Sequence, residues 1–595
     1  MNPIRALRTC SVVAAACLSL FLLHNASLHG QEREEAGEVL ARGPIHEAFA
    51  QPVVFEAQAG QTIPKEPPEP IQELPPDQKP EGDDVQWIAG YWAWDADRDD
   101  FIWVSGIWRN IPPEMQWSPG YWSRIGDGWQ WISGYWSRTD TTDTEYLPPP
   151  PETLESGPST EAPSAEHTWS PGCWVWQETR YLWRPGIWVR LRPGWMWCPP
   201  HYVYTPLGYV FVDGYWDYVF DRRGIVCAPI YWIQPIYRRP QFVYIPRIII
   251  DLRTVIHHLF VMPRYGHYVF GDYYANAYVN RGIYPWFSFH MSRHGFDPVY
   301  AYYRRQFIAS DTDWEARLRA QYRLLREQEG LRPARNFRQQ ATVAANIRQD
   351  ARARDLLRAE NFMLAKTVAD VAADSKIRFE KVAEAQRKQA VEQTNQLRQI
   401  QQTRVKVEVS RDPQRKPVDR PTKVERPKSP IAPKATTERK DPQKGPPPRP
   451  EAPKIDPQVK PKGKPKQLPT PETNLDKPKV DPKKKVEPPV KPKPPVKDPT
   501  DPPVKPKPKV DPPVKDPMPK PKVDPPKKDP PDPPVKPKPK VDPKPKVDPP
   551  KVDPPPKPKP KDPKDPKDPK DKKDKDKKDK DKKDKDKKDD EKKDG

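Results

Sequence analysis

A six-residue pattern with tryptophan at both ends and a glycine between them, WxxGxW, recurs through the first third of the chain. It occupies residues 87–92, 103–108, 117–122, 131–136, 169–174 and 183–188, and a degenerate copy, FVDGYW, spans 211–216. Neighbouring glycines within a block are 14 or 16 residues apart, and turn-like stretches such as DADRDD and RIGDG separate the copies. Aromatic runs with turns at this spacing predict an antiparallel β-meander. One copy is too short to bury its own face, so the copies must pack on one another.

Alternation of side chains along a strand explains the content of one copy, WQWISGYW at residues 129–136. Trp131 and Tyr135 share a face and flank the small Ser133, while Gly134 leaves bare backbone on the other face. We expect a tryptophan ring from a neighbouring strand to cover each such glycine. The residue before the glycine is proline in three copies, which predicts that regular ladder pairing is broken there.

Aromatic strings continue after the repeats, as VFVDGYWDYVFDRRGIVCAPIYW, LFVMPRYGHYVFGDYY and PVYAYYRRQF. Together with the WxxGxW copies, these strings resemble a family of exported bacterial proteins known as YXWGXW or WXXGXW repeat proteins. The resemblance covers residues 85–335, and it implies an aromatic repeat architecture and an exported location. It implies no activity and carries over no catalytic residue.

Composition divides the rest of the chain. Prolines number 87 among 595 residues, and most follow residue 410, where aromatics are absent. Such sequence cannot bury enough apolar surface to offset the entropy of ordering it. We therefore expect a disordered Pro/Lys/Asp-rich tail at 411–595 and an acidic, proline-rich linker at 31–84. The aromatic repeat β-domain is expected at 85–305, with a disordered insertion at 139–166.

Helical patterns begin after the aromatic region. The string TDWE at 312–315 forms a candidate capping box, and Trp314, Leu318, Tyr322 and Leu325 follow one helix face. These residues predict a helix over 311–332. A second stretch, 341–405, contains no proline or glycine and predicts one long helix or coiled coil. The predicted fold class is thus mainly β, an antiparallel meander followed by α-helices and the tail.

Residues 1–30 have the form of an export signal. Arg5 and Arg8 precede the apolar run SVVAAACLSLFLL, which is too short to span a bilayer. Cleavage by signal peptidase after Gly30 and lipoprotein processing at Cys17 both remain open. No later stretch predicts a membrane-spanning helix. Three cysteines remain in the exported chain (Cys173, Cys198 and Cys227), and their pairing is left open.

No motif predicts catalysis, a cofactor or a metal site. His290 and His294 have the spacing of a helical metal pair, but HMSRH lacks the glutamate of HExxH. The acidic stretch DADRDD lacks the glycine and final glutamate of a calcium loop, so a solvated hairpin tip is the favoured interpretation. We therefore expect a protein that is not an enzyme.

Charge and aromatics indicate what the chain contacts. The net charge is +21, with an acidic front and a basic rear, which suits an envelope or extracellular polymer or an acidic protein partner. Nucleic acid is not expected, because alternating Lys and Asp screen each other and the tail lacks stacking aromatics. The leading hypothesis is an exported structural or scaffolding protein of the cell envelope or surface, with self-assembly left open. The alternative is a glycan-binding module that stacks sugars on exposed rings, for which the candidate residues are Tyr91, Tyr121, Tyr135, Trp92, Trp122 and Trp136.

Overall fold

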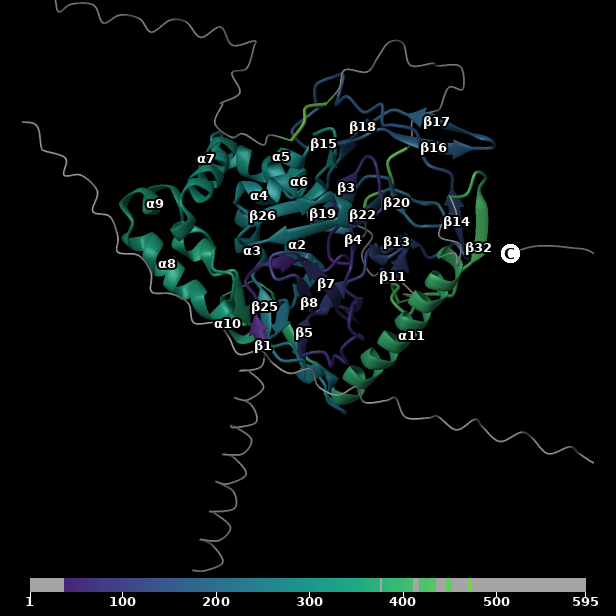
Figure 1. Cartoon of the computed structure of the whole chain (residues 1–595). Helices are drawn as coiled ribbons and strands as arrows, with labels where there is room; N and C mark the ends of the chain where they lie inside the picture. The colour runs from purple at the N-terminus through teal and green to yellow at the C-terminus, as the bar shows by residue number, and fades with distance from the viewer. Residues whose placement is uncertain (1–36, 375–376, 410–416, 435–445, 452–467, 472–595) are drawn as a thin grey trace, which may run out of the picture. The chain divides into compact units, whose positions relative to one another are not determined.

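Four broken hairpins, each built from two successive copies of the repeat, form the aromatic region of the protein. The computed structural model describes residues 37–374, 377–409, 417–434, 446–451 and 468–471, all of which belong to one unit within residues 1–487. The predicted signal at 1–30 and most of the tail predicted at 411–595 lie outside the described residues. Within the described part, the predicted antiparallel β-architecture followed by helices is confirmed (Figure 1).

Each arm of a hairpin is interrupted after its first strand and resumes two residues later. The first hairpin comprises β6 (Val85–Ile88), β7 (Tyr91–Asp95), β8 (Asp100–Val104) and β9 (Ile107–Asn110). The second comprises β10 (Met115–Ser118), β11 (Tyr121–Ile125), β12 (Gly128–Ile132) and β13 (Tyr135–Arg138). The third comprises β15 (His167–Ser170), β16 (Cys173–Gln177), β17 (Arg180–Arg184) and β18 (Ile187–Arg190). The fourth comprises β19 (Trp195–Cys198), β20 (His201–Tyr204), β21 (Tyr209–Val212) and β22 (Tyr215–Tyr218).

The register places the two copies of a hairpin face to face. In the first hairpin Trp87 lies opposite Trp108 and Trp92 lies opposite Trp103. The ring centroids of these pairs are 5.4 Å and 5.2 Å apart, in edge-to-face contact. Such aromatic pairs add about 0.5–1.5 kcal/mol each beyond the area they bury. Corresponding pairs recur in the other hairpins: Trp117–Trp136, Trp122–Trp131, Trp169–Trp188, Trp174–Trp183, Trp197–Trp216 and Tyr202–Phe211.

The fourth hairpin reveals a copy of the repeat that the sequence pattern hides. The degenerate copy at 211–216 pairs with residues 197–202, WCPPHY, in which Pro200 replaces the glycine and Tyr202 replaces the second tryptophan. The sequence pattern identifies seven copies, an odd number, so one of them would lack a partner if the hidden copy did not exist. The structural unit is therefore the two-copy hairpin rather than the single copy.

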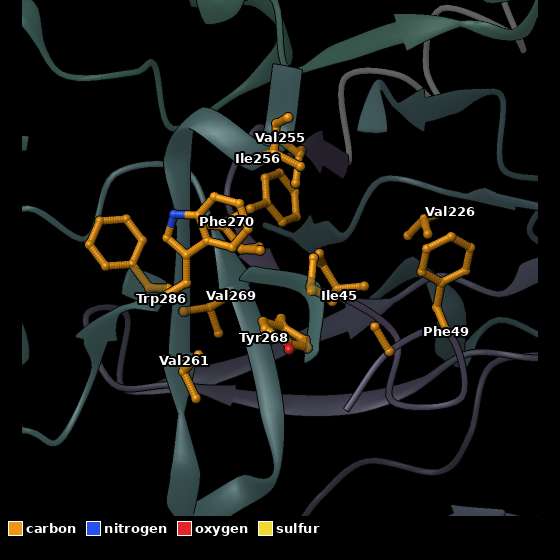
Figure 2. Close-up of a cluster of buried hydrophobic side chains, with 14 of the residues drawn as sticks. Ile45, Phe49, Val226, Val255, Ile256, Val261, Tyr268, Val269, Phe270 and Trp286 are labelled. Carbon is orange, nitrogen blue, oxygen red and sulfur yellow. The ribbon is translucent and has the colours of Figure 1, made fainter. Parts of the chain in front are cut away.

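The segment predicted as a linker at 31–84 is instead part of the core from residue 37 onward. It contributes five short strands: β1 (Gly37–Val39), β2 (Gly43–Pro44), β3 (Val53–Val54), β4 (Thr62–Ile63) and β5 (Gln78–Pro80). Figure 2 shows Ile45 and Phe49 in one buried cluster with Tyr268, Val269 and Trp286. Proline-rich sequence cannot form its own core, but its few apolar side chains complete the core of another region.

That other region follows the hairpins. It contains β23 (Gly224–Val226), β24 (Ile230–Trp232), β26 (Leu259–Met262), β27 (His267–Phe270), α5 (Trp286–Phe289) and α6 (Pro298–Ser310). β1 pairs with β24, and β2 pairs with β27, so the first described residues join strands that lie about two hundred residues later in the chain. Tertiary burial rather than local propensity holds these short strands in place.

The helices differ in length from the sequence prediction. The predicted 311–332 helix is α7 (Trp314–Glu327), and its four predicted apolar residues are all buried. The predicted single helix at 341–405 is wrong, because this stretch contains α8 (Gln340–Gln349), α9 (Ala351–Leu356), α10 (Val368–Asp374) and the first part of α11 (Glu384–Glu408) (Figure 1). The Asp350 carboxylate accepts the N–H groups of Arg352 and Ala353, so it caps a new helix where continuity was predicted.

Two further predicted disordered regions contain structure. The 139–166 insertion includes β14 (Asp143–Leu147), which pairs with β21 and with β32 (Thr422–Glu425). β32 itself falls in the predicted tail, and Ile431, a few residues later, is fully buried. None of the described helices is both long and apolar enough to cross a membrane.

Candidate functional site

Tryptophan rings cover the repeat glycines, as the sequence predicts. A methyl group built on Gly134 would lie 2.5 Å from Cζ2 of Trp117, and one on Gly120 would lie 2.5 Å from Cζ2 of Trp131. In each case the ring is the first tryptophan of the paired copy. Any side chain larger than hydrogen would displace the ring, which explains why the pattern requires glycine at this position.

The interruption of each hairpin arm also frees the glycine N–H from the β-ladder. The glycines lie in the two-residue breaks rather than in continuous strands, so the predicted alternation of faces through the whole copy is wrong at this point. The prediction that ladder pairing is broken there is confirmed. A freed and buried N–H needs an acceptor.

Glutamate carboxylates supply that acceptor, in an arrangement we call a clasp: a buried carboxylate bound by the N–H group of one or both repeat glycines of a hairpin. In the second hairpin, the N–H groups of Gly120 and Gly134 donate to Oε1 and Oε2 of Glu47, each at 3.0 Å. Glu47 is 2% exposed and comes from the sequence IHEAF, more than seventy residues before the glycines. One carboxylate thus joins both copies of the hairpin to the N-terminal segment.

The first hairpin holds a second clasp. Gly90 N–H donates to Oε2 of Glu73 at 2.9 Å, and Gly106 N–H reaches both oxygens at 3.1 Å and 3.2 Å. The indole N–H of Trp103 adds a bond to Oε1 at 3.0 Å. Glu73 lies in the proline-rich sequence EPIQELPP.

The third hairpin repeats the arrangement with a different segment. Gly172 N–H donates to Oε2 of Glu155 at 2.5 Å, and the indole N–H of Trp169 donates to Oε1 at 3.3 Å. Glu155 belongs to PPPPETLESGP, inside the insertion predicted to be disordered. Three hairpins therefore each bind one glutamate from outside the repeat.

The fourth hairpin has no such carboxylate among the described contacts. Pro200 occupies one glycine position and has no N–H to offer. The N–H of Gly214 donates instead to the side chain of its own neighbour, Asp213. The hairpin fold therefore survives without a clasp.

Comparison with known proteins agrees with this division of the chain. The family model described as WXXGXW repeat (2 copies) matches residues 82–109, 115–137 and 167–189, which are the first three hairpins. The chain therefore contains WXXGXW repeats. No curated protein and no solved structure matches it. The two copies of the family model correspond to one clasp-bearing hairpin in each matched stretch.

Burial controls the electrostatics of the clasps in these WXXGXW repeats. Desolvation raises the pKa of Glu47 to about 7, although the glycine N–H groups oppose the shift. Burial likewise raises the pKa of Glu73 and of Glu155 above the ordinary value of a glutamate. The hydrogen-bond donors to these carboxylates are uncharged backbone and indole groups, so the proton affinity of the acid is set mainly by loss of water.

Helix α11 braces the second hairpin on the side of its carbonyl groups. The Gln401 amide donates to the Gly120 carbonyl at 2.6 Å, and the Arg404 guanidinium donates to the Pro119 carbonyl at 2.7 Å. Arg404 also pairs with Glu408, which accepts the hydroxyl of Tyr121. The N–H groups of Gly120 and Gly134 are thus bound in the clasp, and the carbonyls of Pro119 and Gly120 are bound by α11.

The candidate glycan residues lie largely in the interior. Tyr91, Trp92, Tyr121, Tyr135 and Trp136 are all at most 9% exposed, and Trp122 is half-buried. Four of the six line one cavity of 580 Å³ between the first two hairpins and α11: Tyr91, Trp92, Tyr121 and Trp122. Tyr135 and Trp136 do not line it. The predicted row of exposed rings is therefore wrong, although the structure brings four of those rings together.

The groups considered for metal chemistry have other partners. Asp97 forms ion pairs with Arg42 and Arg281, and Asp100 with Lys65, so the DADRDD turn is tied to cations of the protein itself. Burial lowers the pKa of His290 to about 3. The described residues contain no cluster of three or more His, Cys, Asp or Glu side chains arranged to hold a metal ion. Cys173, Cys198 and Cys227 are all free thiols in this structure.

The clasps are the feature that sequence reasoning missed. A signal was present for two of them, because Glu73 and Glu155 each lie within two residues of a proline or glycine in an otherwise unexplained segment, whereas Glu47 in IHEAF has no such neighbour. The prediction that glycine leaves bare backbone concerned only its missing side chain. It did not include an acceptor for the N–H group of that glycine.

Proposed function

We propose that this protein is a non-catalytic scaffolding protein of the cell envelope or surface, in which the WXXGXW hairpin is an assembly module. The observation that carries the proposal is the recurrence of the clasp. Three hairpins bind three glutamates from outside the repeat, and each clasp ties one further stretch of chain to an aromatic hairpin. A repeated element that fastens peptide segments, with aromatic packing around the junction, suits a structural role.

Location is part of this proposal and rests on the sequence of residues 1–30. The test is cell fractionation with an antibody against the hairpins, together with the N-terminal sequence of the mature chain. Recovery in the envelope or medium, with cleavage after Gly30 or at Cys17, supports export. Recovery of the uncleaved chain in the cytoplasm contradicts it.

The basic tail serves in this proposal as an electrostatic tether. Its lysines match the negative charge of acidic envelope polymers, and such attraction weakens as salt rises. A chain truncated after Val409 is the informative variant. Retention of the full chain on an acidic polymer, reversed by salt and lost on truncation, supports the tether, whereas equal retention of both chains contradicts it.

Glycan binding is the second candidate, and the aromatic cavity favours it. Sugar rings stack on tryptophan and tyrosine faces, and the cavity also presents Arg398, Gln401 and Lys406 as polar partners. Titration with soluble cell-wall polysaccharide tests it on the full chain. Saturable binding that is weakened by Trp122→Ala but kept by Trp94→Ala, a half-buried ring that does not line the cavity, supports this candidate. Absence of saturable binding contradicts it.

A further inference from the structure

Two of the clasp glutamates arrive on segments that lie across their hairpins in the same way. We call residues 66–75 (EPPEPIQELP) the first strap and residues 148–160 (PPPPETLESGPST) the third strap, after the hairpins they cross. Both are proline-rich, and both carry a second glutamate shortly before the one in the clasp. Their shared contacts indicate a recognition mode that belongs to the hairpin.

The third strap is held by side-chain donors of the third hairpin. Besides the Glu155 clasp, the indole N–H of Trp174 donates to the carbonyl of Glu152 at 2.8 Å. The indole N–H of Trp188 donates to the Thr160 hydroxyl at 3.2 Å. The Tyr181 hydroxyl donates to the carbonyl of Pro148 at 2.5 Å. The hairpin thus binds a carboxylate and backbone carbonyls of an extended segment.

The first hairpin makes the equivalent contact with its own strap. The indole N–H of Trp92 donates to the carbonyl of Glu69 at 3.0 Å. Trp92 and Trp174 occupy the same position, the second tryptophan, in their copies of the repeat. Glu73 then enters the clasp four residues later, as Glu155 does three residues after Glu152. The same two hairpin groups therefore engage the same two strap groups at two places in the chain.

The fourth hairpin shows what happens when these groups are absent. Tyr202 and Phe211 replace the two central tryptophans, and Pro200 replaces a glycine. This hairpin has lost the indole donors at its centre and one of the glycine N–H groups. Among the described residues no glutamate carboxylate binds the glycine N–H of this hairpin, although the indole N–H of Trp216 donates to the carbonyl of Pro448 at 3.2 Å.

The third site is the more accessible of the two. Trp87 and Trp103 of the first hairpin are at most 1% exposed, whereas every tryptophan of the third hairpin is half-buried. In the third strap, only the Glu155 side chain is buried. Its recognition uses the carbonyls of a proline-rich backbone, which are free because such a backbone forms no internal hydrogen bonds. Another copy of the same segment can satisfy every one of these donors.

We infer that the third hairpin is a binding site for an extended, proline-rich peptide segment that carries a glutamate, and that it takes the third strap of a second copy of this chain in exchange for its own. This rests on the proposed assembly function and gives that function a partner. Exchange of identical segments between copies needs no new contact, and it links copies at low energetic cost. The tethered strap has an effective concentration on the order of millimolar, so exchange is favoured in a concentrated environment.

Peptide binding to the full chain tests the recognition step. The probe is a fluorescent peptide of residues 148–160, and the receptor is the Glu155→Gln chain, whose own strap is weakened. We expect saturable binding to this variant that is about fivefold tighter than to the wild-type chain, where the intact strap competes. The Glu155→Gln peptide should bind about fivefold more weakly, while the Glu152→Gln peptide, equal in charge, should bind normally because only its carbonyl is used. Equal binding of the two variant peptides, or no saturable binding, overturns the inference.

Two further experiments complete the test of strap exchange. If the Glu155→Gln chain does not fold, saturation-transfer NMR on the wild-type chain with millimolar peptide replaces it, with the same two peptide controls. Sedimentation of the wild-type chain tests the second copy as the source: dimers that dissociate on addition of the peptide support it, and a monomer at all concentrations overturns it. Recovery of the chain in the cytoplasm contradicts the proposed location without affecting either result, so the two failures are distinguishable.

Discussion

The first and third hairpins carry the same repeat and the same clasp, yet they differ in how much of the protein surrounds them. Trp87, Trp103 and Glu73 in the first hairpin and its clasp are at most 2% exposed. Ala390 of α11 packs against Trp87, and Ile63 and Ile71 of the N-terminal segment pack in the cluster that contains Trp103. The third hairpin keeps its strap and its clasp with half-buried rings. The clasp therefore does not depend on deep burial. We expect burial instead to determine how much stability each clasp contributes.

Enlarging a glycine gives the largest expected contrast between the two hairpins. A methyl group at Gly106 would lie 2.3 Å from Cζ2 of Trp87 and 2.7 Å from the Ile88 carbonyl oxygen, in a region with no room to relax. We expect Gly106→Ala to lower the free energy of unfolding by about 3 kcal/mol or more. Gly172→Ala meets a half-buried Trp183 ring and should cost less. Urea denaturation measures both.

Gly330→Ala is the control for these two variants. No atom lies within 4 Å of the added methyl group there, and the backbone is not left-handed, so we expect a change within about 0.5 kcal/mol. Equal losses for Gly106→Ala and Gly172→Ala would show that burial does not separate the two hairpins.

The pH dependence of the free energy of unfolding reports the contribution of the Glu47 carboxyl group in the second hairpin. Because burial raises the pKa of Glu47 from 4.5 to about 7, the native state binds more protons than the unfolded chain between these values. Stability from this group is therefore present below pH 4.5 and is lost as pH rises toward 7, by an amount on the order of 3 kcal/mol. Urea midpoints at intervals from pH 4.5 to 7.5 should fall in the wild-type chain and fall less in Glu47→Gln. The exposed Glu66→Gln should follow the wild type, and parallel curves for all three chains would refute the assignment.

Replacing the carboxylate of the first clasp has the next effect in size. In Glu73→Gln, an amide nitrogen that cannot accept a hydrogen bond faces one of the donors Gly90, Gly106 or Trp103. Leaving a buried donor unsatisfied costs about 1–3 kcal/mol. Glu69→Gln is the matched control on the same strap, since only the Glu69 carbonyl is used. Thermal unfolding should separate the two variants, and coincident curves would contradict the clasp.

The same change in the third hairpin should have the smallest global effect. Glu155→Gln is expected to lower the free energy of unfolding by about 1 kcal/mol or less, because its surroundings are partly solvated and water can replace the lost contact. Local hydrogen exchange in residues 148–160 and 167–190 should rise nevertheless. A loss as large as that of Glu73→Gln would show that the third strap is as deeply integrated as the first.

The sequence predicted those features that depend on local pattern. Spacing and aromatic content indicated antiparallel strands, and the bare backbone at Gly134 indicated a covering ring, which is Trp117. The proline-rich segments could not be predicted in the same way. Composition says that Glu73 and Glu155 lie in sequence unable to fold alone, but not that distant hairpins offer them a site. The hidden copy at 197–202 escaped because Pro200 and Tyr202 replace the residues that define the pattern.

The break in the long predicted helix has a similar origin. Ala, Gln and Arg favour helix throughout 341–405, and neither proline nor glycine interrupts them. Phe362 and Leu364 are nevertheless buried, and β30 (Ala365–Thr367) pairs with β25 (Ile248–Ile250). Burial of a few apolar side chains against distant strands outweighs local helix propensity.

Amide hydrogen exchange resolved at the four glycines of the first two hairpins tests the central claim most directly. If buried glutamates hold these N–H groups, Glu47→Gln should lower protection at Gly120 and Gly134 and leave Gly90 and Gly106 unchanged. Glu73→Gln should do the reverse. Protection that is equal at all four glycines in both variants and the wild-type chain would contradict the account.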